Sequence, residues 1–425
     1  KASSTWPAPC SGWAECRSGL AAAILLSSPA PSSAGDWVPA WMASPQPVWS
    51  ADFLFPTDVP ATLKNRTLRQ VARIGIGGTA VRIRLSNDDG HSEVQIAATH
   101  LARSTGGMTI EPSSDRALTF GGEAESTILP GASILSDPVK MQVEAGEALA
   151  VSLNFAEEVP VETFHWDGKA ESRLVEGLHV KDTDLPAGET LTQRLFLSDI
   201  LVDAPEAKGT VVVLGDSITD GAGAALGADT RWPDYLAARA APEGIAVVNA
   251  GISGARLLSD RMGANALARL DRDVLAQPKI RTLILMLGIN DIAWPGTPFA
   301  PGEPPMSFER LTAGYRQIAA RARAHGVRIV GATLPPFAGA LPGTPLEATY
   351  YSADKDALRR RINDWIRTSG TFDAVADFDR LLADPADPMQ FLPSYDSGDR
   401  LHPGDPGNKA MADAIDLDTI LGDTP

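Results

Sequence analysis

The sequence predicts an α/β protein in which an all-β, jelly-roll-like sandwich precedes a three-layer, doubly wound domain with a five-stranded parallel sheet. Two observations predict this order. Residues 36–203 alternate apolar and polar side chains with period two, whereas residues 204–425 alternate short apolar runs with helical patterns. The length of 425 residues also favours more than one domain.

Residues 1–35 resemble a secretory leader. An apolar run at 20–26 is followed by Ser, Pro and Ala, and Ser32-Ser33-Ala34 resembles a small-residue cleavage site. The alternative is a disordered, low-complexity leader. From the first interpretation we expect a secreted or periplasmic protein. The two cysteines, Cys10 and Cys16, both fall in this segment and form neither a disulfide framework nor a metal pattern.

The segment 37–202 is expected to form half-buried antiparallel strands. Apolar and polar residues alternate in several runs, at 81–86, 94–98, 139–143 and 149–155. Turn residues rich in Gly, Asp and Asn separate these runs, as at 87–90. Turn signals at this spacing are typical of a β-sandwich or a jelly roll.

The composition changes at 203–209, which predicts a linker. Beyond it, continuous apolar runs predict strands that are buried on both faces, at 211–214, 246–248, 282–287, 327–330 and 374–377. Helical patterns lie between them, at 232–241, 264–275, 308–325 and 355–368. This alternation is typical of a parallel, doubly wound sheet.

Charge and composition exclude several kinds of partner. The formal net charge is −16 and no concentrated Lys/Arg run occurs, which argues against nucleic acid and against an anionic membrane surface. No eighteen consecutive residues are apolar, so no membrane-spanning helix is expected. No metal-ligand motif and no phosphate-binding Gly-rich loop is found, so we expect no metal and no cofactor. The oligomeric state stays open.

Three polar residues follow three of the predicted strands. Ser217 comes three residues after the run that ends at 214, and Gly254 and Asn290 follow the next two runs in the same way. In an open α/β sheet, ligands bind outside the carboxyl ends of the strands. We therefore expect these three residues to converge on one edge of the sheet.

The residue types at this edge are those that acyl transfer requires. A serine hydroxyl becomes a nucleophile only when a base removes its proton, and His402 is the best candidate for that base. Asp399, three residues earlier, is placed to hold the imidazole in the correct tautomer. The backbone N–H groups of Ser217 and Gly254 and the side-chain amide of Asn290 would stabilise the oxyanion.

Four segments of the chain resemble the sequence blocks of the SGNH (GDSL) hydrolase family: Gly215-Asp216-Ser217-Ile218, Gly251-Ile252-Ser253-Gly254, Gly288-Ile289-Asn290-Asp291 and Asp399-Arg400-Leu401-His402. The resemblance implies a five-stranded α/β/α fold with Ser217 as nucleophile, Gly254 and Asn290 in the oxyanion hole, and Asp399 with His402 as the remaining pair. Ile218 stands where Leu is common in the family.

The upstream region resembles the two-domain branch of this family, in which a β-sandwich precedes the hydrolase. The segments Trp37-Val38-Pro39-Ala40-Trp41 and Gln46-Pro47-Val48-Trp49 carry this resemblance. It implies an arylesterase or a carbohydrate (xylan) esterase.

Several of these residues have alternative interpretations. Asn290 and Asp291 could cap a helix, and we expect Asp291 and Asp216 to be structural. Other histidines compete for the role of base, namely His91, His100, His165, His179 and His325. Trp294, His165 and Tyr350 are candidate substrate contacts, because they lie in loops or among aromatic residues. The alternative for each of the three is simple burial in the core.

The sequence thus predicts a serine esterase that hydrolyses short-chain acyl esters, acetyl above all, on acetylated plant carbohydrate. The alternatives are a broad-specificity arylesterase or lysophospholipase and, from another class, a carbohydrate-binding protein that acts through its N-terminal domain. The last alternative is motivated by Trp37, Trp41 and Trp49, because exposed aromatic rings stack on sugars. A β-domain that only buttresses the substrate pocket is the interpretation that we favour.

Overall fold

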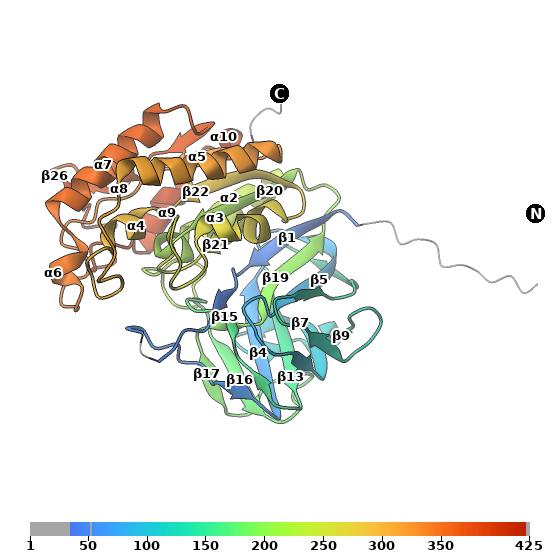
Figure 1. Ribbon diagram of the computed structural model, residues 1–425. Coiled ribbons are helices and arrows are strands. Elements are labelled where there is room, and N and C mark those ends of the chain that lie inside the picture. The colour runs from blue at the N-terminus through green and yellow to red at the C-terminus, as the bar shows by residue number, and fades with distance from the viewer. Residues whose placement is uncertain (1–34, 52, 422–425) are drawn as a thin grey trace, which may run out of the picture. The chain divides into compact units, whose positions relative to one another are not determined.

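A β-rich part and an α/β part follow each other along the chain (Figure 1). The computed structural model describes residues 35–51 and 53–421, so the leader predicted for residues 1–35 and both cysteines lie outside the described residues, apart from Gly35. The β-rich part ends with β19 (Leu197–Asp203), and the α/β part begins with β20 (Gly209–Gly215). The predicted domain limits themselves stay predictions, and the described residues from Asp36 onward form one compact unit.

Among the described residues, the β-rich part contains two large antiparallel sheets and three small ones. The first has the order β1-β19-β5-β11, with β12 also paired to β5. The second has the order β17-β16-β4-β13-β7-β8, with β9 also paired to β7. The strands of the first sheet besides β19 are β1 (Trp37–Met42), β5 (Gly78–Ser86), β11 (Ser133–Leu135) and β12 (Val139–Val143).

The second sheet consists of β4 (Arg66–Arg73), β7 (Ala98–Gly106), β8 (Thr109–Ile110), β9 (Arg116–Leu118), β13 (Ala148–Phe155), β16 (Ser172–Glu176) and β17 (Glu189–Leu191). Shorter strands connect and flank the sheets, namely β2 (Gln46–Pro47), β3 (Thr62–Leu63), β6 (Val94–Ile96), β10 (Ser126–Ile128), β14 (Val159–Pro160), β15 (Thr163–His165) and β18 (Arg194–Leu195). A 3₁₀ turn lies at Pro112–Ser114.

The alternating apolar residues form the core between the two sheets, as predicted. Val81, Ile83 and Leu85 of β5 pack in one cluster with the apolar residues of β13. Strand β13 departs from the half-buried expectation, because Ser152 on its other face is buried as well. Arg69 of β4 covers that face and donates a hydrogen bond from Nε to the Ser152 hydroxyl at 2.9 Å.

The α/β part has a five-stranded, fully parallel sheet with the order β21-β20-β22-β23-β24. Its strands besides β20 are β21 (Ile245–Gly251), β22 (Ile280–Met286), β23 (Arg328–Ala332) and β24 (Ala374–Ala376). This order is that of a doubly wound sheet of the flavodoxin type and confirms the predicted fold class.

Helices cover both faces of the sheet (Figure 1). On one face, Val212 and Leu214 of β20 pack against α3 (Ala266–Leu270), α5 (Phe308–Ala324) and α7 (Ala353–Thr368). On the other face, Val211 and Val213 pack against α2 (Trp232–Ala240), α8 (Phe378–Leu382) and α9 (Asp405–Asp413). Alternate residues of one strand thus contact opposite helical layers, which is why the run reads as continuously apolar.

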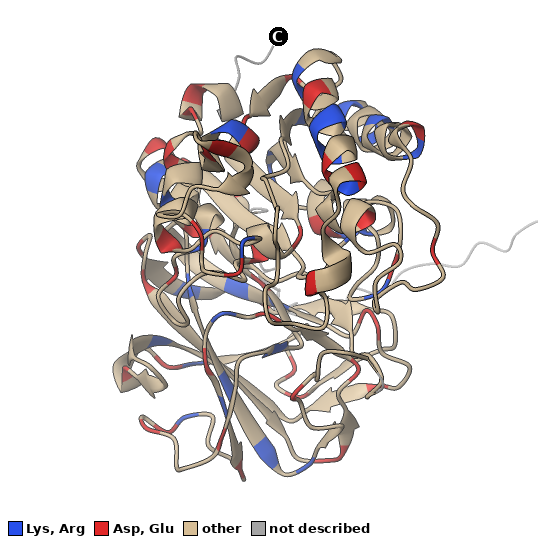
Figure 2. Cartoon of the chain, turned by 90° about the vertical axis from the view of Figure 1, so that its left-hand side faces the viewer, with Lys and Arg blue, Asp and Glu red and all other residues tan. Residues whose placement is uncertain are grey.

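Short elements complete the α/β part: α1 (Ser217–Asp220), α4 (Ile289–Ala293), α6 (Glu347–Tyr350), α10 (Leu417–Leu421), β25 (Ala383–Asp384), β26 (Asp387–Phe391), a 3₁₀ turn at Ala241–Glu243 and a π turn at Asp271–Leu275. Basic and acidic residues are interspersed on the face that Figure 2 shows. No described helix has the length and apolar character that crossing a bilayer requires.

The carboxyl end of β21 tolerates only glycine, which gives a test of the packing at this edge. A Cβ atom at Gly251 would lie 2.5 Å from the backbone nitrogen of Asp220, and backbone atoms cannot yield as a flexible side chain can. We expect Gly251→Ala to lower the free energy of unfolding by about 1–3 kcal/mol in urea titrations. Gly302→Ala is the matched control, because open space surrounds Gly302. Equal stability of the two variants would contradict the packing described.

Candidate active site

The register of the parallel strands brings the candidate residues to one edge. Gly215 at the end of β20 pairs with Gly251 of β21 on one side and with Met286 of β22 on the other. The buried guanidinium of Arg269 ties two of these ends together, donating to the carbonyl oxygens of Gly215 at 3.0 Å and Ala250 at 2.7 Å. The segments that follow the three strands therefore leave the sheet side by side.

Ser217, His402 and Asp399 form a continuous hydrogen-bonded chain. The Ser217 Oγ lies 2.8 Å from His402 Nε2, and His402 Nδ1 lies 2.6 Å from Asp399 Oδ2. A tight turn makes the second contact possible, because Arg400 adopts a left-handed conformation with φ of 58°. The other carboxylate oxygen of Asp399 accepts the backbone N–H groups of Leu401 and His402.

The environment of Asp399 favours its ionised form. Partial burial alone would raise the pKa of this carboxyl, but the hydrogen bond and the charge interaction with His402 and the two backbone N–H groups hold the pKa well below its usual range. A permanently ionised Asp399 can fix the proton on His402 Nδ1 and leave Nε2 free to accept the Ser217 proton.

Gly254 has a backbone conformation and a packing that exclude a side chain. Its φ is +75°, and a Cβ atom there would lie 2.3 Å from the sulfur of Met262 and 3.1 Å from the ring of Trp294. Both Gly254 and Ser217 line one cavity, which we call the Ser217 cavity.

The side-chain amide of Asn290 is held from both ends. Its Nδ2 donates to the carbonyl oxygen of Ala255 at 3.0 Å, and its Oδ1 accepts a hydrogen bond from the Tyr350 hydroxyl at 2.8 Å. Burial raises the pKa of Tyr350, so the phenol stays protonated and able to donate. The amide group has a second N–H that the contact with Ala255 does not use. The sequence indicates Tyr350 only as a candidate substrate contact, and no pattern in it predicts the bond to Asn290.

The Ser217 cavity has a volume of about 310 Å³. Ser217, His402, Gly254 and Asn290 all line it, and so do the predicted contacts Trp294 and Tyr350. Its other walls are mostly apolar, and they include Met262, Phe299, Leu341, Leu346 and Leu401. The four segments of the sequence motif therefore open onto one cavity.

The β-rich part supplies one wall of this cavity through Phe55, Trp166, Asp167 and Lys169. The two rings lie 5.5 Å apart. Asp167 accepts a hydrogen bond from the Ser253 hydroxyl at 3.2 Å and lies 3.5 Å from the ammonium group of Lys169. Burial raises the pKa of Asp167. No motif in the sequence indicated these residues, apart from their place next to the aromatic segment at 164–166.

His165 is not among the residues that line the Ser217 cavity, although it was a predicted substrate contact. Its ring is buried, with Nδ1 3.0 Å from the carbonyl oxygen of Ser44 and Nε2 3.0 Å from Asp220 Oδ1. The other oxygen of Asp220 accepts the backbone N–H of Ser253, next to Gly254. His165 thus connects the β-rich part to the loop that carries Gly254.

Asp216 and Asp291 form backbone hydrogen bonds of the kind expected for structural residues. Asp216 caps α1 by accepting the N–H of Ile218 at 3.1 Å, and Asp291 accepts the N–H groups of Leu257 and Leu258 at 2.7 and 3.0 Å. Burial raises the pKa of Asp216 to about 7 and that of Asp291 to about 6. Within the described part of the chain, no group of three or more His, Cys, Asp or Glu side chains is arranged to hold a metal ion.

Residues 213–410 match the model of the GDSL-like lipase/acylhydrolase family. The chain carries a GDSL-like acylhydrolase domain. It is therefore an ester hydrolase, and the match confirms the family that the four sequence segments resemble. A search of curated proteins found no match.

Solved structures of GDSL-type esterases resemble the GDSL-like domain. An acetylxylan esterase from Geobacillus stearothermophilus is 23% identical, with a TM-score of 0.37, over 52% of this chain and 97% of that one. The aryl esterase of M. smegmatis is 16% identical, with a TM-score of 0.39, over 48% and 95%. A GDSL-like lipase from Bacteroides thetaiotaomicron is 17% identical, with a TM-score of 0.36, over 48% and 84%. At such TM-scores these likenesses carry no weight for the substrate.

The raised pKa of Asp216 predicts a specific dependence of stability on pH. The folded state retains the proton of Asp216 up to about pH 7, whereas an unfolded aspartate loses it near pH 4. Between these values the folded state binds more protons, so the contribution of Asp216 to stability falls as pH rises.

We expect the free energy of unfolding of the wild type, relative to Asp216→Asn, to fall by on the order of 1 kcal/mol per pH unit between about pH 4 and about pH 7. Urea titrations of both proteins across this range measure the difference. A difference that is constant with pH would contradict the buried, protonated state of Asp216.

Proposed function

We propose that this ester hydrolase is a serine esterase that cleaves short-chain acyl esters, acetyl esters above all, through an acyl-enzyme on Ser217. The observation that carries the proposal is the 2.8 Å contact between Ser217 Oγ and His402 Nε2, with Asp399 on the opposite ring nitrogen. A nucleophile, a base and an orienting carboxylate at hydrogen-bond distance are what this reaction requires.

In the first half of the reaction, Ser217 Oγ attacks the ester carbonyl while His402 Nε2 takes its proton. The carbonyl oxygen gains the negative charge, and His402 returns the proton to the departing alcohol as the acyl-enzyme forms. In the second half, water attacks the acyl group while His402 takes its proton, the bond between the acyl carbon and Ser217 Oγ breaks, and His402 returns the proton to Ser217 as the carboxylic acid leaves. Asp399 stays ionised throughout and stabilises the imidazolium.

The developing oxyanion would lie between three donors: the backbone N–H groups of Ser217 and Gly254 and the second N–H of the Asn290 amide. Tyr350 acts as a positioning residue in this scheme. Because its hydroxyl donates to Asn290 Oδ1, the amide cannot rotate to present its oxygen to the substrate without losing that bond. The oxyanion donor is thereby held in place before substrate binds.

The dimensions and lining of the Ser217 cavity support a short acyl group. Its volume of about 310 Å³ is at the lower end of the range for small-molecule sites, which favours acetyl over the long chain of a lysophospholipid. On the wall from the β-rich part, Asp167 and Lys169 offer an acceptor and a donor for hydroxyl groups beside the ring of Trp166. Flat rings flanked by polar groups suit sugars, so we favour acetylated plant carbohydrate as substrate.

Aryl esters are the second candidate. Trp294 and Phe299 pack with their ring centroids 4.6 Å apart, and Phe299 also contacts Phe55 of the β-rich part. An aromatic leaving group would fit against such a wall.

Carbohydrate binding through exposed tryptophans has less support. The guanidinium group of Arg82 covers the ring of Trp37 at 4.1 Å, and Trp49 packs against Phe53, Phe164 and Trp166. We propose instead that the β-rich part buttresses and completes the Ser217 cavity. Secretion, which the leader at residues 1–35 predicts, would suit a polysaccharide substrate and stays part of the proposal.

The reaction and its substrate can be tested with one panel of esters. The enzyme should hydrolyse p-nitrophenyl acetate faster than esters of longer acids and should release acetate from acetylated xylan. Ser217→Ala should abolish both activities while circular dichroism and Tm stay unchanged, and Ser113→Ala, at an exposed serine, is the control.

Residual turnover in Ser217→Ala would reject the nucleophile. Preference for long acyl chains without acetate release would reject the short-chain carbohydrate ester, and hydrolysis of phenyl acetate alone would favour the aryl ester.

The contact between Tyr350 and Asn290 predicts a graded effect on kcat. Asn290→Ala removes an oxyanion donor and should lower kcat by about 10²–10³. Tyr350→Phe removes only the bond that orients the amide, so a loss of about tenfold is expected, with little change in KM. Tyr351→Phe is the matched control, because Tyr351 does not line the Ser217 cavity. A change in KM alone for Tyr350→Phe would show that Tyr350 contacts substrate instead of positioning Asn290.

A further inference from the structure

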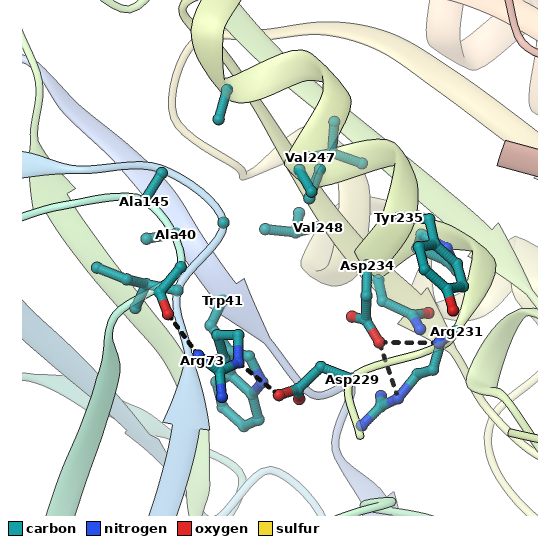
Figure 3. Close-up of a pocket in the computed structure, with 18 of the residues that line it drawn as sticks. Ala40, Trp41, Arg73, Ala145, Asp229, Arg231, Asp234, Tyr235, Val247 and Val248 are labelled. Atoms are coloured by element: carbon teal, nitrogen blue, oxygen red, sulfur yellow. Dashed lines mark hydrogen bonds and ion pairs between the residues drawn. The ribbon is translucent and has the colours of Figure 1, made fainter. Parts of the chain in front are cut away.

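A second cavity lies between β1, the turn at 73–75 and helix α2. Its volume is about 610 Å³, and none of its lining residues lines the Ser217 cavity. We call it the Arg194 cavity. Figure 3 shows that the charged side chains of Arg73, Asp229, Asp234 and Arg231 lie in one half of the view, whereas small apolar side chains occupy the other half.

Arg194 lines this cavity and lacks partners for its charge. The residue is 2% exposed, and its Nε and Nη1 are buried without a hydrogen-bond partner. Its guanidinium lies 5.4 Å from the centroid of the Trp41 ring. This cation–π contact offsets only part of the cost of burying the charge. Within residues 35–51 and 53–421, no carboxylate forms an ion pair with it. A buried cation without acceptors is costly, so a fold seldom retains one without a reason.

The other fully buried arginines show how this fold satisfies such a group. Arg69 donates to the hydroxyl of Ser152 and to the carbonyl oxygens of Met108 and Asp182. Arg269 and Arg359 likewise donate to carboxylates and carbonyl oxygens. In each of these three cases the chain supplies acceptors for the terminal nitrogens, although Arg269 Nε, like Arg194 Nε, has no partner. Arg194 differs because the space next to it is a cavity.

The remaining charges around the cavity do not supply the missing partner. Arg73 Nε pairs with Asp229 at 2.6 Å, and Arg231 Nε lies 3.7 Å from Asp234, so each acid already faces a cation. Among the charged residues that line the cavity, Arg194 is therefore the cation that has no acidic partner. Burial, and then the nearby Arg231, lower the pKa of Arg194 to about 9, and the charge of Asp229 opposes this shift only in part.

We propose that the Arg194 cavity binds a small organic carboxylate, whose oxygen atoms accept hydrogen bonds from Arg194 and whose apolar body lies against Ala40 and Val247. The planar fork of a guanidinium matches the two oxygens of a carboxylate. The apolar half of the cavity favours a ligand with a hydrocarbon body over an inorganic anion, and its volume leaves room for one.

Isothermal titration calorimetry of the full chain tests this proposal with benzoate, its neutral isostere benzamide, and inorganic phosphate. Benzoate should bind and benzamide should not, because only the carboxylate can pair with Arg194. Arg194→Met should weaken benzoate binding by about tenfold or more, and Arg194→Lys should weaken it less, because it keeps the charge and loses the fork. Asn290→Ala should leave benzoate binding unchanged, which separates this cavity from the Ser217 cavity.

Stability gives an independent readout. Without ligand, Arg194→Met should have a Tm no lower than that of the wild type, because the substitution removes a buried charge that has no partner. Arg69→Met should have a lower Tm, because the substitution leaves buried acceptors without their hydrogen-bond donor. Equal binding of benzoate and benzamide, binding of phosphate alone, or benzoate binding that Asn290→Ala removes and Arg194→Met does not would each overturn the proposal. A clear loss of Tm in unliganded Arg194→Met would also overturn the proposal, because it would show that the folded chain itself stabilises the charge of Arg194.

Discussion

The register of β20 between β21 and β22 is the constraint on which the rest of the site depends. Because Gly215 lies opposite both Gly251 and Met286, the loops after three parallel strands leave the sheet at the same level. A slip of two residues would displace one loop by about 7 Å, more than a hydrogen bond can span. The apolar layers on both faces and the contacts of Arg269 with the ends of two strands oppose such a slip.

The β-rich part takes part in this arrangement. The buried pair of His165 and Asp220 connects it to the backbone of Ser253, beside the glycine of the proposed oxyanion hole. Burial alone would raise the pKa of Asp220, but the contact with His165 holds it below its usual value, so the Asp220 carboxylate stays ionised. The position of the Gly254 loop thus depends on residues that lie far away in the sequence.

The same part closes the Ser217 cavity with Trp166, Asp167 and Lys169. A GDSL-like domain alone would leave that wall open to solvent. Substrate selection is therefore expected to depend on the β-rich part, and the chemistry on the α/β part.

Much of the fold could be predicted from the sequence, because local patterns determine it. The five apolar runs and the helices between them agree with the observed strands and helices, and the convergence of Ser217, Gly254 and Asn290 follows from the topology of parallel sheets. The bond between Tyr350 and Asn290 could not be predicted, because it joins residues sixty positions apart through a loop without a periodic pattern. Burial of both faces of β13 also escaped prediction, since it depends on Arg69 of another strand.

Interactions of single charged side chains were the least predictable features. The aromatic neighbours of His165 allow either a substrate contact or a packed position, and its ring is buried against Ser44 and Asp220. Asp167, in the same segment, lines the cavity instead. Whether an arginine such as Arg194 has acceptors depends entirely on tertiary packing. Sequence patterns indicate which residues are buried and where the chain turns. They do not indicate which polar side chains contact each other in the fold.

The proposed function depends on activation of the Ser217 hydroxyl by His402 at the carboxyl edge of the sheet. Mass spectrometry after treatment with a p-nitrophenyl alkylphosphonate tests it most directly, because such reagents label an activated serine covalently. We expect one phosphonyl group per chain, attached to Ser217, and a large loss of the labelling rate in His402→Ala. A label on another residue, or a labelling rate at Ser217 that does not depend on His402, would contradict the proposal.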